Sequence, residues 1–188
     1  MILYTPMKTI PWEVDASKLS DAYIAGFLDG DGSIMATVEK RPDRRRFPYR
    51  VRLRINFTQH ERHRKLIEII QKFLGDVGAV RREKSHHLVE LVIQDRHSVE
   101  QALKRLLPYI VLKERQAKIM LEIIEIYKKA TVHMRSSVTE KEYVSILTLV
   151  RKIRNLNSRT GGKINLEVFN PVTTLRKKTK ELSQRNKG

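Results

Sequence analysis

The chain has 188 residues, of which 40% are hydrophobic and 31% charged, a size and balance that fit one folded domain rather than a disordered chain. Lys and Arg number 38 against 21 Asp and Glu, so the formal net charge is +17 and we expect an anionic partner such as nucleic acid or an acidic membrane surface. The absence of cysteine excludes disulfides, a thiol nucleophile and cysteine-based metal sites.

Residues 1–12 contain two prolines and lack the basic, apolar and small-residue order of a signal peptide. No apolar run approaches the roughly 20 residues that cross a bilayer. We therefore expect an intracellular protein without a membrane partner, located in the cytoplasm or nucleoid or in an organelle such as a chloroplast or mitochondrion.

A short helix is expected from Ser20, which can cap its N-terminus, to about Gly30. Ala22, Gly26 and Gly30 recur every fourth residue, so one face of this helix carries almost no side chains. Such a face lets a second helix approach backbone to backbone. The spacing therefore predicts a close helix–helix contact rather than a short helix that merely frays at its glycines.

Asp29 and Asp31 stand at the C-terminal end of this helix, where the helix dipole disfavours a carboxylate unless a cation offsets the cost. A calcium loop does not fit, because the twelfth residue counted from Asp29 is Lys40 rather than Glu. A zinc helix does not fit either, since His60 and His63 are one residue too close for the His-Glu-x-x-His pattern. A helix that pairs with its own copy would bring two such ends together, and two aspartates could hold a divalent metal against a phosphate.

The positive charge is concentrated between residues 41 and 65, where ten Lys or Arg stand against two acids. A first strand is expected over 33–41, and a basic loop over 42–48 leads to a second strand over 50–57. Alternation in the second strand separates a hydrophobic face (Val51, Leu53, Ile55, Phe57) from a polar face (Arg50, Arg52, Arg54, Asn56). Three arginines with no acid between them repel one another, which favours a nucleic-acid surface over a simply solvated face.

The remaining segments predict a second strand pair and four helices. The strands are expected over 79–84 and 88–94, and the helices over 61–74, 98–107, 113–129 and 140–153. Ser98 with Gln101, and Thr139 with Glu142, have the form of capping boxes at two helix starts. The layout predicts a four-stranded antiparallel sheet made of two hairpins, and the chain contains no internal repeat.

Residues 24–32, Ile-Ala-Gly-Phe-Leu-Asp-Gly-Asp-Gly, resemble the LAGLIDADG signature of the homing endonucleases. A single copy is present, as in the homodimeric branch of that family, and the resemblance extends over residues 22–130. It implies an α+β fold with an αββαββα core, a four-stranded antiparallel saddle sheet and additional C-terminal helices. We accordingly divide the chain into an N-terminal extension (1–18), an endonuclease core (19–136) and a C-terminal helical extension of the same domain (137–188).

The resemblance also implies a cleavage site. Asp31 matches the family's metal-binding aspartate, with the backbone carbonyl of Gly30 as a neighbouring ligand, and Asp29 matches a structural acid. Gln59 matches a residue that orders water, and Lys113 matches a lysine that polarises this water or stabilises charge on the phosphate. The implied metal is Mg²⁺, which Mn²⁺ can replace.

One position departs from the family pattern. Four residues after the glutamine the family places a basic side chain, whereas this chain has His63. A neutral histidine stabilises negative charge more weakly, and Arg62 or Arg64 could take over this role.

The resemblance further implies a DNA-binding surface and a dimer interface. The expected DNA-binding residues are Ser33, Met35, Thr37, Glu39, Arg41, Arg44, Arg45, Arg46, Arg50, Arg52, Arg54, Asn56, Arg81, Glu83, Lys84 and Glu90. Among them, arginine is expected to contact guanine and Asn56 to contact adenine. The expected dimer-interface residues are Ala22, Gly26, Asp29 and Gly30.

The sequence thus predicts a homodimeric, Mg²⁺-dependent endonuclease that cuts both strands of a long pseudo-palindromic DNA site and leaves three-prime overhangs. Two alternatives of the same fold remain open: a maturase that binds its own intron RNA and assists splicing, and a DNA-binding regulator that does not cleave.

Overall fold

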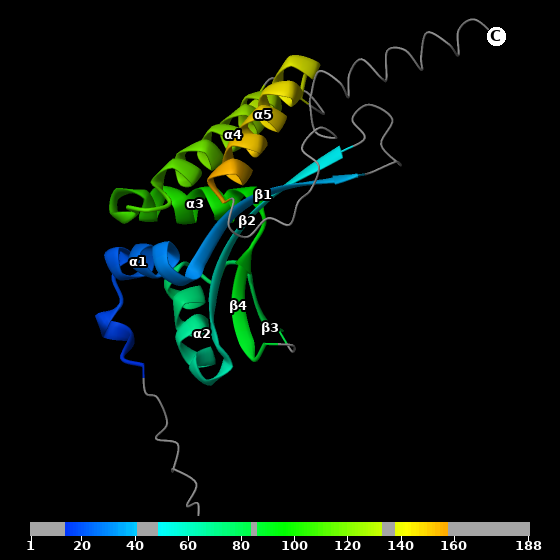
Figure 1. Cartoon of the computed structure of the whole chain (residues 1–188). Coiled ribbons are helices and arrows are strands. Elements are labelled where there is room, and N and C mark those ends of the chain that lie inside the picture. The colour runs from blue at the N-terminus through cyan, green and yellow to red at the C-terminus, as the bar shows by residue number, and fades with distance from the viewer. Residues whose placement is uncertain (1–13, 41–48, 84–85, 133–137, 158–188) are drawn as a thin grey trace, which may run out of the picture.

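The computed structural model describes residues 14–40, 49–83, 86–132 and 138–157 (Figure 1). Within them, four strands and three α-helices follow the predicted αββαββα order, and two further α-helices come after it. The strands are β1 (Gly32–Lys40), β2 (Tyr49–His60), β3 (Ala79–Glu83) and β4 (Leu88–Ile93). The α-helices are α1 (Asp21–Asp31), α2 (Arg64–Phe73), α3 (Arg96–Leu106), α4 (Glu114–Val132) and α5 (Glu140–Leu156). Short 3₁₀ turns span Ala16–Lys18 (η1), Glu61–His63 (η2) and Leu107–Tyr109 (η3).

The four strands form one antiparallel sheet in the order β1-β2-β4-β3, which confirms the predicted pair of hairpins. The two hairpins join where β2 pairs with β4, from Ile55 opposite Ile93 to His60 opposite Leu88. The α-helices lie on one side of the curved sheet (Figure 1). The alternation predicted for β2 is also confirmed, because Val51, Leu53, Ile55 and Phe57 are all buried against these helices. The opposite face therefore carries the polar set.

Side chains define the helix starts, and one start differs from the prediction. The hydroxyl of Ser20 accepts a hydrogen bond from the Tyr23 amide, so α1 begins as expected. Helix α3, in contrast, begins at Arg96 rather than at Ser98, because the Asp95 carboxylate accepts from the Ser98 amide at 2.8 Å and caps the helix earlier. The predicted Ser98 capping box is therefore wrong.

Helix α5 belongs to the same hydrophobic core as the sheet. Its start is the predicted capping box, in which Thr139 and Glu142 satisfy each other's backbone amides. It packs against α4 and β1, and just beyond its end the Asn157 side-chain amide donates to the Ile34 carbonyl at 2.8 Å. The described part of the C-terminal segment is thus helical and packs against α4 and β1, while the division into a core and an extension stays a prediction. Among the described residues, none of the helices is both long and apolar enough to cross a bilayer.

Candidate functional site

One face of α1 is bare and solvent-exposed, as the four-residue spacing predicts. Ala22, Gly26 and Gly30 are exposed, whereas Ile24 and Leu28 are fully buried on the other side of the helix. A β-carbon added at Gly26 or Gly30 would meet no atom within 4 Å. No described residue of the chain therefore occupies the space over these two glycines.

Asp29 points into its own chain rather than to this bare face. Its side chain is only 9% exposed, and its carboxylate accepts backbone hydrogen bonds from Val111 at 2.7 Å and from Leu112 and Lys113 at 3.0 Å each. These three amides immediately precede α4, so Asp29 fastens the end of α1 to the start of α4. Asp29 therefore lies off the bare face, and its assignment to the dimer interface stays a prediction. The structure also shows what offsets the unfavourable helix dipole at this acid, namely three N–H donors rather than a metal ion.

Lys113 lies beside the same helix end. Its ammonium group donates to the backbone carbonyl of Asp29, and its side chain is partly buried. Burial lowers the pKa of Lys113 below the ordinary lysine value, and the nearby Asp29 and Asp31 carboxylates oppose this shift. The cation of Lys113 is thus within electrostatic reach of both acids.

Asp31 is exposed at the end of α1 and contacts Gln59 from the end of β2. The Gln59 Nε2 donates to Asp31 Oδ2 at 3.3 Å, while its Oε1 accepts from the His60 amide at 2.8 Å. The second hydrogen bond fixes which way the Gln59 amide points. The structure therefore brings together Asp31, Gln59 and Lys113, three predicted site residues from three separate elements.

The fourth predicted site residue, His63, lies in η2 directly after β2. Its Nε2 accepts a hydrogen bond from the Arg62 guanidinium at 3.0 Å, so the histidine presents an unprotonated nitrogen to that cation. Arg62 is therefore a cation next to the position where the family pattern has a basic side chain. The role of His63 remains a prediction.

The polar face of the sheet collects the predicted DNA-binding residues from all four strands. Across β1 and β2, the backbone register pairs Met35 with Arg54, Thr37 with Arg52 and Glu39 with Arg50. Across β3 and β4, it pairs Arg81 with Glu90 and Glu83 with Leu88. The Glu39 carboxylate also forms an ion pair with Arg52 at 2.7 Å, so an acid interrupts the arginine row that the β2 sequence alone suggested. Ser33 lies opposite Asn56 at the end of the face nearest α1.

Asn56 differs from the other members of this face because it is only 5% exposed, and its Oδ1 has no hydrogen-bond partner among the described residues. It lies between Ser33 and Val92, and Val92 is itself 3% exposed. Neighbouring residues of the sheet thus cover Asn56 in the free chain, and the expected adenine contact stays a prediction. The predicted DNA-binding residues Arg41, Arg44, Arg45, Arg46 and Lys84 lie outside the described residues.

The part of the chain that carries these residues also resembles a known protein family. The family model described as LAGLIDADG endonuclease matches residues 24–120, which is more than half of the chain. The chain belongs to the LAGLIDADG endonuclease family. The match begins in α1 and ends in α4, so it includes Asp31, Gln59 and Lys113.

Two LAGLIDADG relatives are DNA endonucleases from green algae. The chain is 36% identical to DNA endonuclease I-CvuI of Chlorella vulgaris over 108 residues, 57% of this chain and 65% of that protein, slightly under two thirds of its length. It is 28% identical to DNA endonuclease I-CreI of Chlamydomonas reinhardtii over 150 residues, 80% of this chain and 86% of that protein. A crystal structure of I-CvuI with the I-CreI target superposes with a TM-score of 0.71 at 29% identity, covering 84% of this chain and 92% of the other.

The metal that the LAGLIDADG family implies needs more ligands than one chain offers. No group of three or more His, Cys, Asp or Glu side chains within the described ranges could hold a metal ion. Asp31 supplies one exposed carboxylate, and the carbonyl of the preceding Gly30 is a second oxygen. Mg²⁺ is commonly held by one or two carboxylates together with phosphate and water. One carboxylate and one carbonyl oxygen therefore fit a divalent metal ion of this kind, with its remaining ligands supplied from outside the described residues.

Thr58, His60 and two exposed hydrophobic residues were not among the predicted site residues. Thr58 continues the polar face of β2 and its hydroxyl donates to the Glu90 carboxylate at 3.3 Å, and His60 follows two residues later on the same face. The alternation of β2 continues through His60, so extending the pattern beyond Phe57 would have found both. Val111 and Leu112, 79% and 75% exposed, lie beside Asp29, and no sequence pattern marks them.

Proposed function

We propose that this chain is a site-specific double-stranded DNA endonuclease that acts as a homodimer and hydrolyses phosphodiester bonds with Mg²⁺, for which Mn²⁺ can substitute. The observation that carries the proposal is the position of Asp31, which is exposed at the end of the bare face of α1 and is hydrogen-bonded to Gln59. A non-cleaving DNA-binding protein has no use for an exposed acid at this place, because a carboxylate repels phosphate.

The open space over Gly26 and Gly30 supports the dimer. A second α1 helix packed against these glycines would place the Asp31 residues of the two copies near one another at the dyad. Val111 and Leu112 lie near the C-terminal end of α1 and carry large apolar side chains that no described part of the chain covers. A symmetric contact of this kind would bury both the bare helix face and these two residues.

The polar face of the sheet supports DNA as the substrate. Arginines at 50, 52, 54 and 81 project from it, and a dimer would double the formal charge of +17. Arginine binds phosphate and guanine edges through its planar fork of donors. Two such faces related by a dyad would read the two halves of a pseudo-palindromic site. The relative I-CvuI was crystallised with DNA targets.

The cleavage chemistry follows from three side chains. Asp31 and the Gly30 carbonyl would hold the divalent metal, which when bound lowers the pKa of water and neutralises phosphate charge. Gln59, oriented by the His60 amide, would position the attacking water, and the Lys113 ammonium would stabilise the negative charge that develops on the phosphate. Water adds to phosphorus as the bond to the leaving oxygen breaks, so each strand ends in a phosphate and a hydroxyl group.

The target sequence can be obtained by selection, which also tests the proposal. A library of random DNA duplexes is incubated with the protein and Mg²⁺, and cleaved molecules are recovered by ligation to their overhangs. We expect enrichment of one pseudo-palindromic sequence cut on both strands with three-prime overhangs, and no recovery in EDTA. Sequence-specific binding without cleavage in Mg²⁺ or Mn²⁺ would instead identify a regulator. Binding to RNA alone would indicate the maturase alternative.

A further inference from the structure

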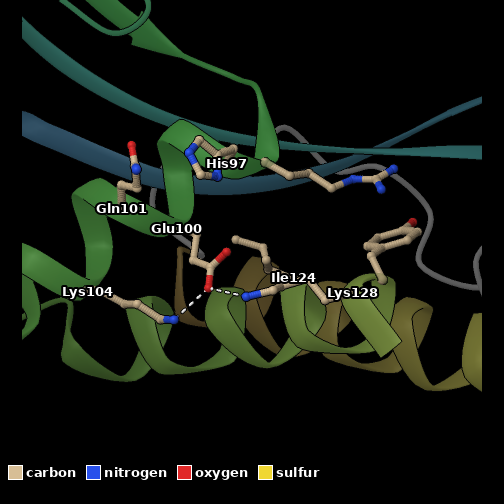
Figure 2. Close-up of a pocket in the computed structure, with 8 residues that line it drawn as sticks. His97, Glu100, Gln101, Lys104, Ile124 and Lys128 are labelled. Atoms are coloured by element: carbon tan, nitrogen blue, oxygen red, sulfur yellow. Dashed lines mark hydrogen bonds and ion pairs between the residues drawn. The ribbon is translucent and has the colours of Figure 1, made fainter. Parts of the chain in front are cut away.

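An open cavity of about 460 Å³ lies between helices α3 and α4, and none of the residues of the proposed cleavage site lines it. All of its lining residues come from these two helices or from the first residues of α3, and none comes from the sheet. Figure 2 shows that charged side chains from both helices converge there around Glu100.

Glu100 holds two lysines together across the cavity. Its carboxylate is only 9% exposed, and its Oε1 accepts from Lys104 at 2.6 Å on the same helix and from Lys128 at 2.9 Å on α4 (Figure 2). Hydrogen bonds from Lys104 and then from Lys128 lower the pKa of Glu100, and the same contact raises the pKa of Lys128. One carboxylate thus fixes two ammonium groups that keep further N–H donors for an anion.

The other lining residues make the cavity amphiphilic. The Arg96 guanidinium lies 3.7 Å from the centre of the Tyr127 ring, and Ile124 adds a buried hydrophobic wall. Among the lining residues, Arg96 and the two lysines supply three positive charges against the single negative charge of Glu100, and Glu125 lies near Lys128 outside the lining. A cavity with an aromatic and aliphatic wall on one side and an excess of cations on the other suits a ligand that joins a flat apolar ring to an anion.

Arg96 also links this cavity to the polar face of the sheet. It lines a second hollow, of about 540 Å³, together with Arg50 and Arg52 of β2. The two hollows therefore share one arginine, and the arginines of the sheet continue toward the α3–α4 cavity. This continuity indicates that the anion is of the same class that the sheet is expected to bind.

We propose that the α3–α4 cavity is a second nucleic-acid site, which holds a single unstacked nucleotide with its base beside Tyr127 and Ile124 and its phosphate on those N–H groups of Lys104 and Lys128 that do not bind Glu100. A paired base in a duplex cannot enter, because its ring is stacked and its edge is occupied. A free mononucleotide and a nucleotide within a single strand share this chemistry. The site goes beyond the proposed cleavage of duplex DNA.

A substitution at Gln101 tests the cavity without altering charge. Gln101 lines the cavity from an exposed position of α3 and takes no part in the Glu100 ion pairs. Gln101→Trp fills the space, and Gln101→Ala leaves it open. With the sheet blocked by excess duplex DNA, we expect adenosine monophosphate to bind Gln101→Trp at least tenfold more weakly than the wild-type protein, and Gln101→Ala within twofold of it.

A second pair of variants tests whether the Lys104 ammonium group binds the phosphate of the nucleotide. Lys104→Gln removes an ion pair of the (i, i+4) type with Glu100, and Lys118→Gln removes the equivalent exposed pair with Glu114, at the same 2.6 Å distance. We expect Lys104→Gln to weaken binding of adenosine monophosphate at least fivefold and Lys118→Gln to leave it within twofold.

Four probes show which parts of the nucleotide are bound and whether it is free or part of a single strand. We expect adenosine and inorganic phosphate each to bind at least tenfold more weakly than adenosine monophosphate. A ten-nucleotide oligodeoxyadenylate that binds at least tenfold more tightly than the monophosphate identifies a single strand as the source, and equal affinities identify the free nucleotide. Equal binding by wild type and Gln101→Trp, or by phosphate and adenosine monophosphate, would overturn the proposal. Duplex cleavage should stay within twofold of wild type in both Gln101 variants, so this outcome is independent of the proposed endonuclease activity.

Discussion

Two acids that are two residues apart have opposite surroundings. Asp29 turns into the chain and accepts three backbone hydrogen bonds, whereas Asp31 is exposed and contacts only the Gln59 amide among the hydrogen bonds of the described residues. The first carboxylate thus stabilises the junction of α1 with α4, and the second is available for a metal. Their distinct environments separate a structural role from the proposed catalytic one.

Substitution of either acid by its amide should therefore have different effects on stability. Asp29→Asn removes the charge from three N–H···O contacts, so we expect the free energy of unfolding to fall by about 1–3 kcal/mol in urea titrations. Asp31→Asn is at an exposed position and should change it by less than ~0.5 kcal/mol. Equal losses in the two variants would contradict this division.

Lys113 gives the proposed reaction a distinctive pH dependence. Burial lowers the pKa of Lys113, and only its protonated form can stabilise negative charge on the phosphate. Cleavage should therefore decline as the pH rises through a value below the ordinary lysine pKa. We expect this alkaline decline in single-turnover rates of the wild-type protein and expect Lys113→Arg, which stays protonated, to lack it. An identical decline in both proteins would assign the titration to another group.

The residues of the site could be predicted from the sequence only in part. The signature at residues 24–32 and the positions of Gln59 and Lys113 indicate which side chains meet, because a family motif carries spatial information. The partners of Asp29 were not predictable, since their amides are 82–84 residues farther along the chain and only the packing of α4 brings them near. Burial of Asn56 was missed for a similar reason, because alternation assigns a face but not the neighbours that cover it.

At the scale of elements, local patterns predicted the sheet and most helices. Strict alternation in β2 identified both faces, and Thr139 with Glu142 identified the start of α5. Helix α3 starts earlier than predicted because Asp95 and Ser98 are both good capping residues and the sequence does not state which is used. The residue at which a helix or strand ends depends on such competition between neighbouring capping residues. Whether the helix or strand forms depends on hydrophobic patterns that run over many residues.

The bare face of α1 yields a prediction that separates stability from assembly. Gly26→Leu places a side chain where the single chain has free space, and leucine favours a helix over glycine by about 0.5–1 kcal/mol. At concentrations low enough for the wild-type chain to be monomeric, we expect the variant to be the more stable protein in urea. Sedimentation at higher concentrations should show a dimer for the wild type and a monomer for Gly26→Leu.

Gly75→Ala is the matched control for this experiment. Gly75 has a φ of +94° in the turn after α2, so alanine should lower stability there by about 1 kcal/mol while the dimer persists. A Gly26→Leu protein that still sediments as a dimer and cleaves DNA would place the interface elsewhere.

At the scale of the whole molecule, the excess of positive charge makes the proposed DNA binding sensitive to salt. With +17 on each chain, the affinity for DNA should fall steeply as the salt concentration rises. In a plot of log affinity against log salt concentration, each phosphate contacted adds about 0.9 to the steepness of the slope. Arg50 is exposed on the polar face, so Arg50→Gln should reduce the slope by about 2 in a dimer that uses it twice. The control is Arg115→Gln, which removes the same charge from an exposed position on α4. This variant should alter the slope by less than ~0.5. Equal slopes for the two variants would remove the sheet from the interface.

The central claim is that Asp31 makes a basic DNA-binding fold into a metal-dependent nuclease. The most direct measurement compares wild-type protein with Asp31→Asn on a supercoiled plasmid that carries the selected site, recording binding and linearisation in Mg²⁺. Asp76→Asn serves as control, because it makes the same chemical change at an exposed turn with φ of +56°, which asparagine tolerates. We predict that Asp31→Asn binds the site within a few fold of wild type and cleaves at least ~100-fold more slowly, while Asp76→Asn behaves as wild type; undiminished cleavage by Asp31→Asn would contradict the account.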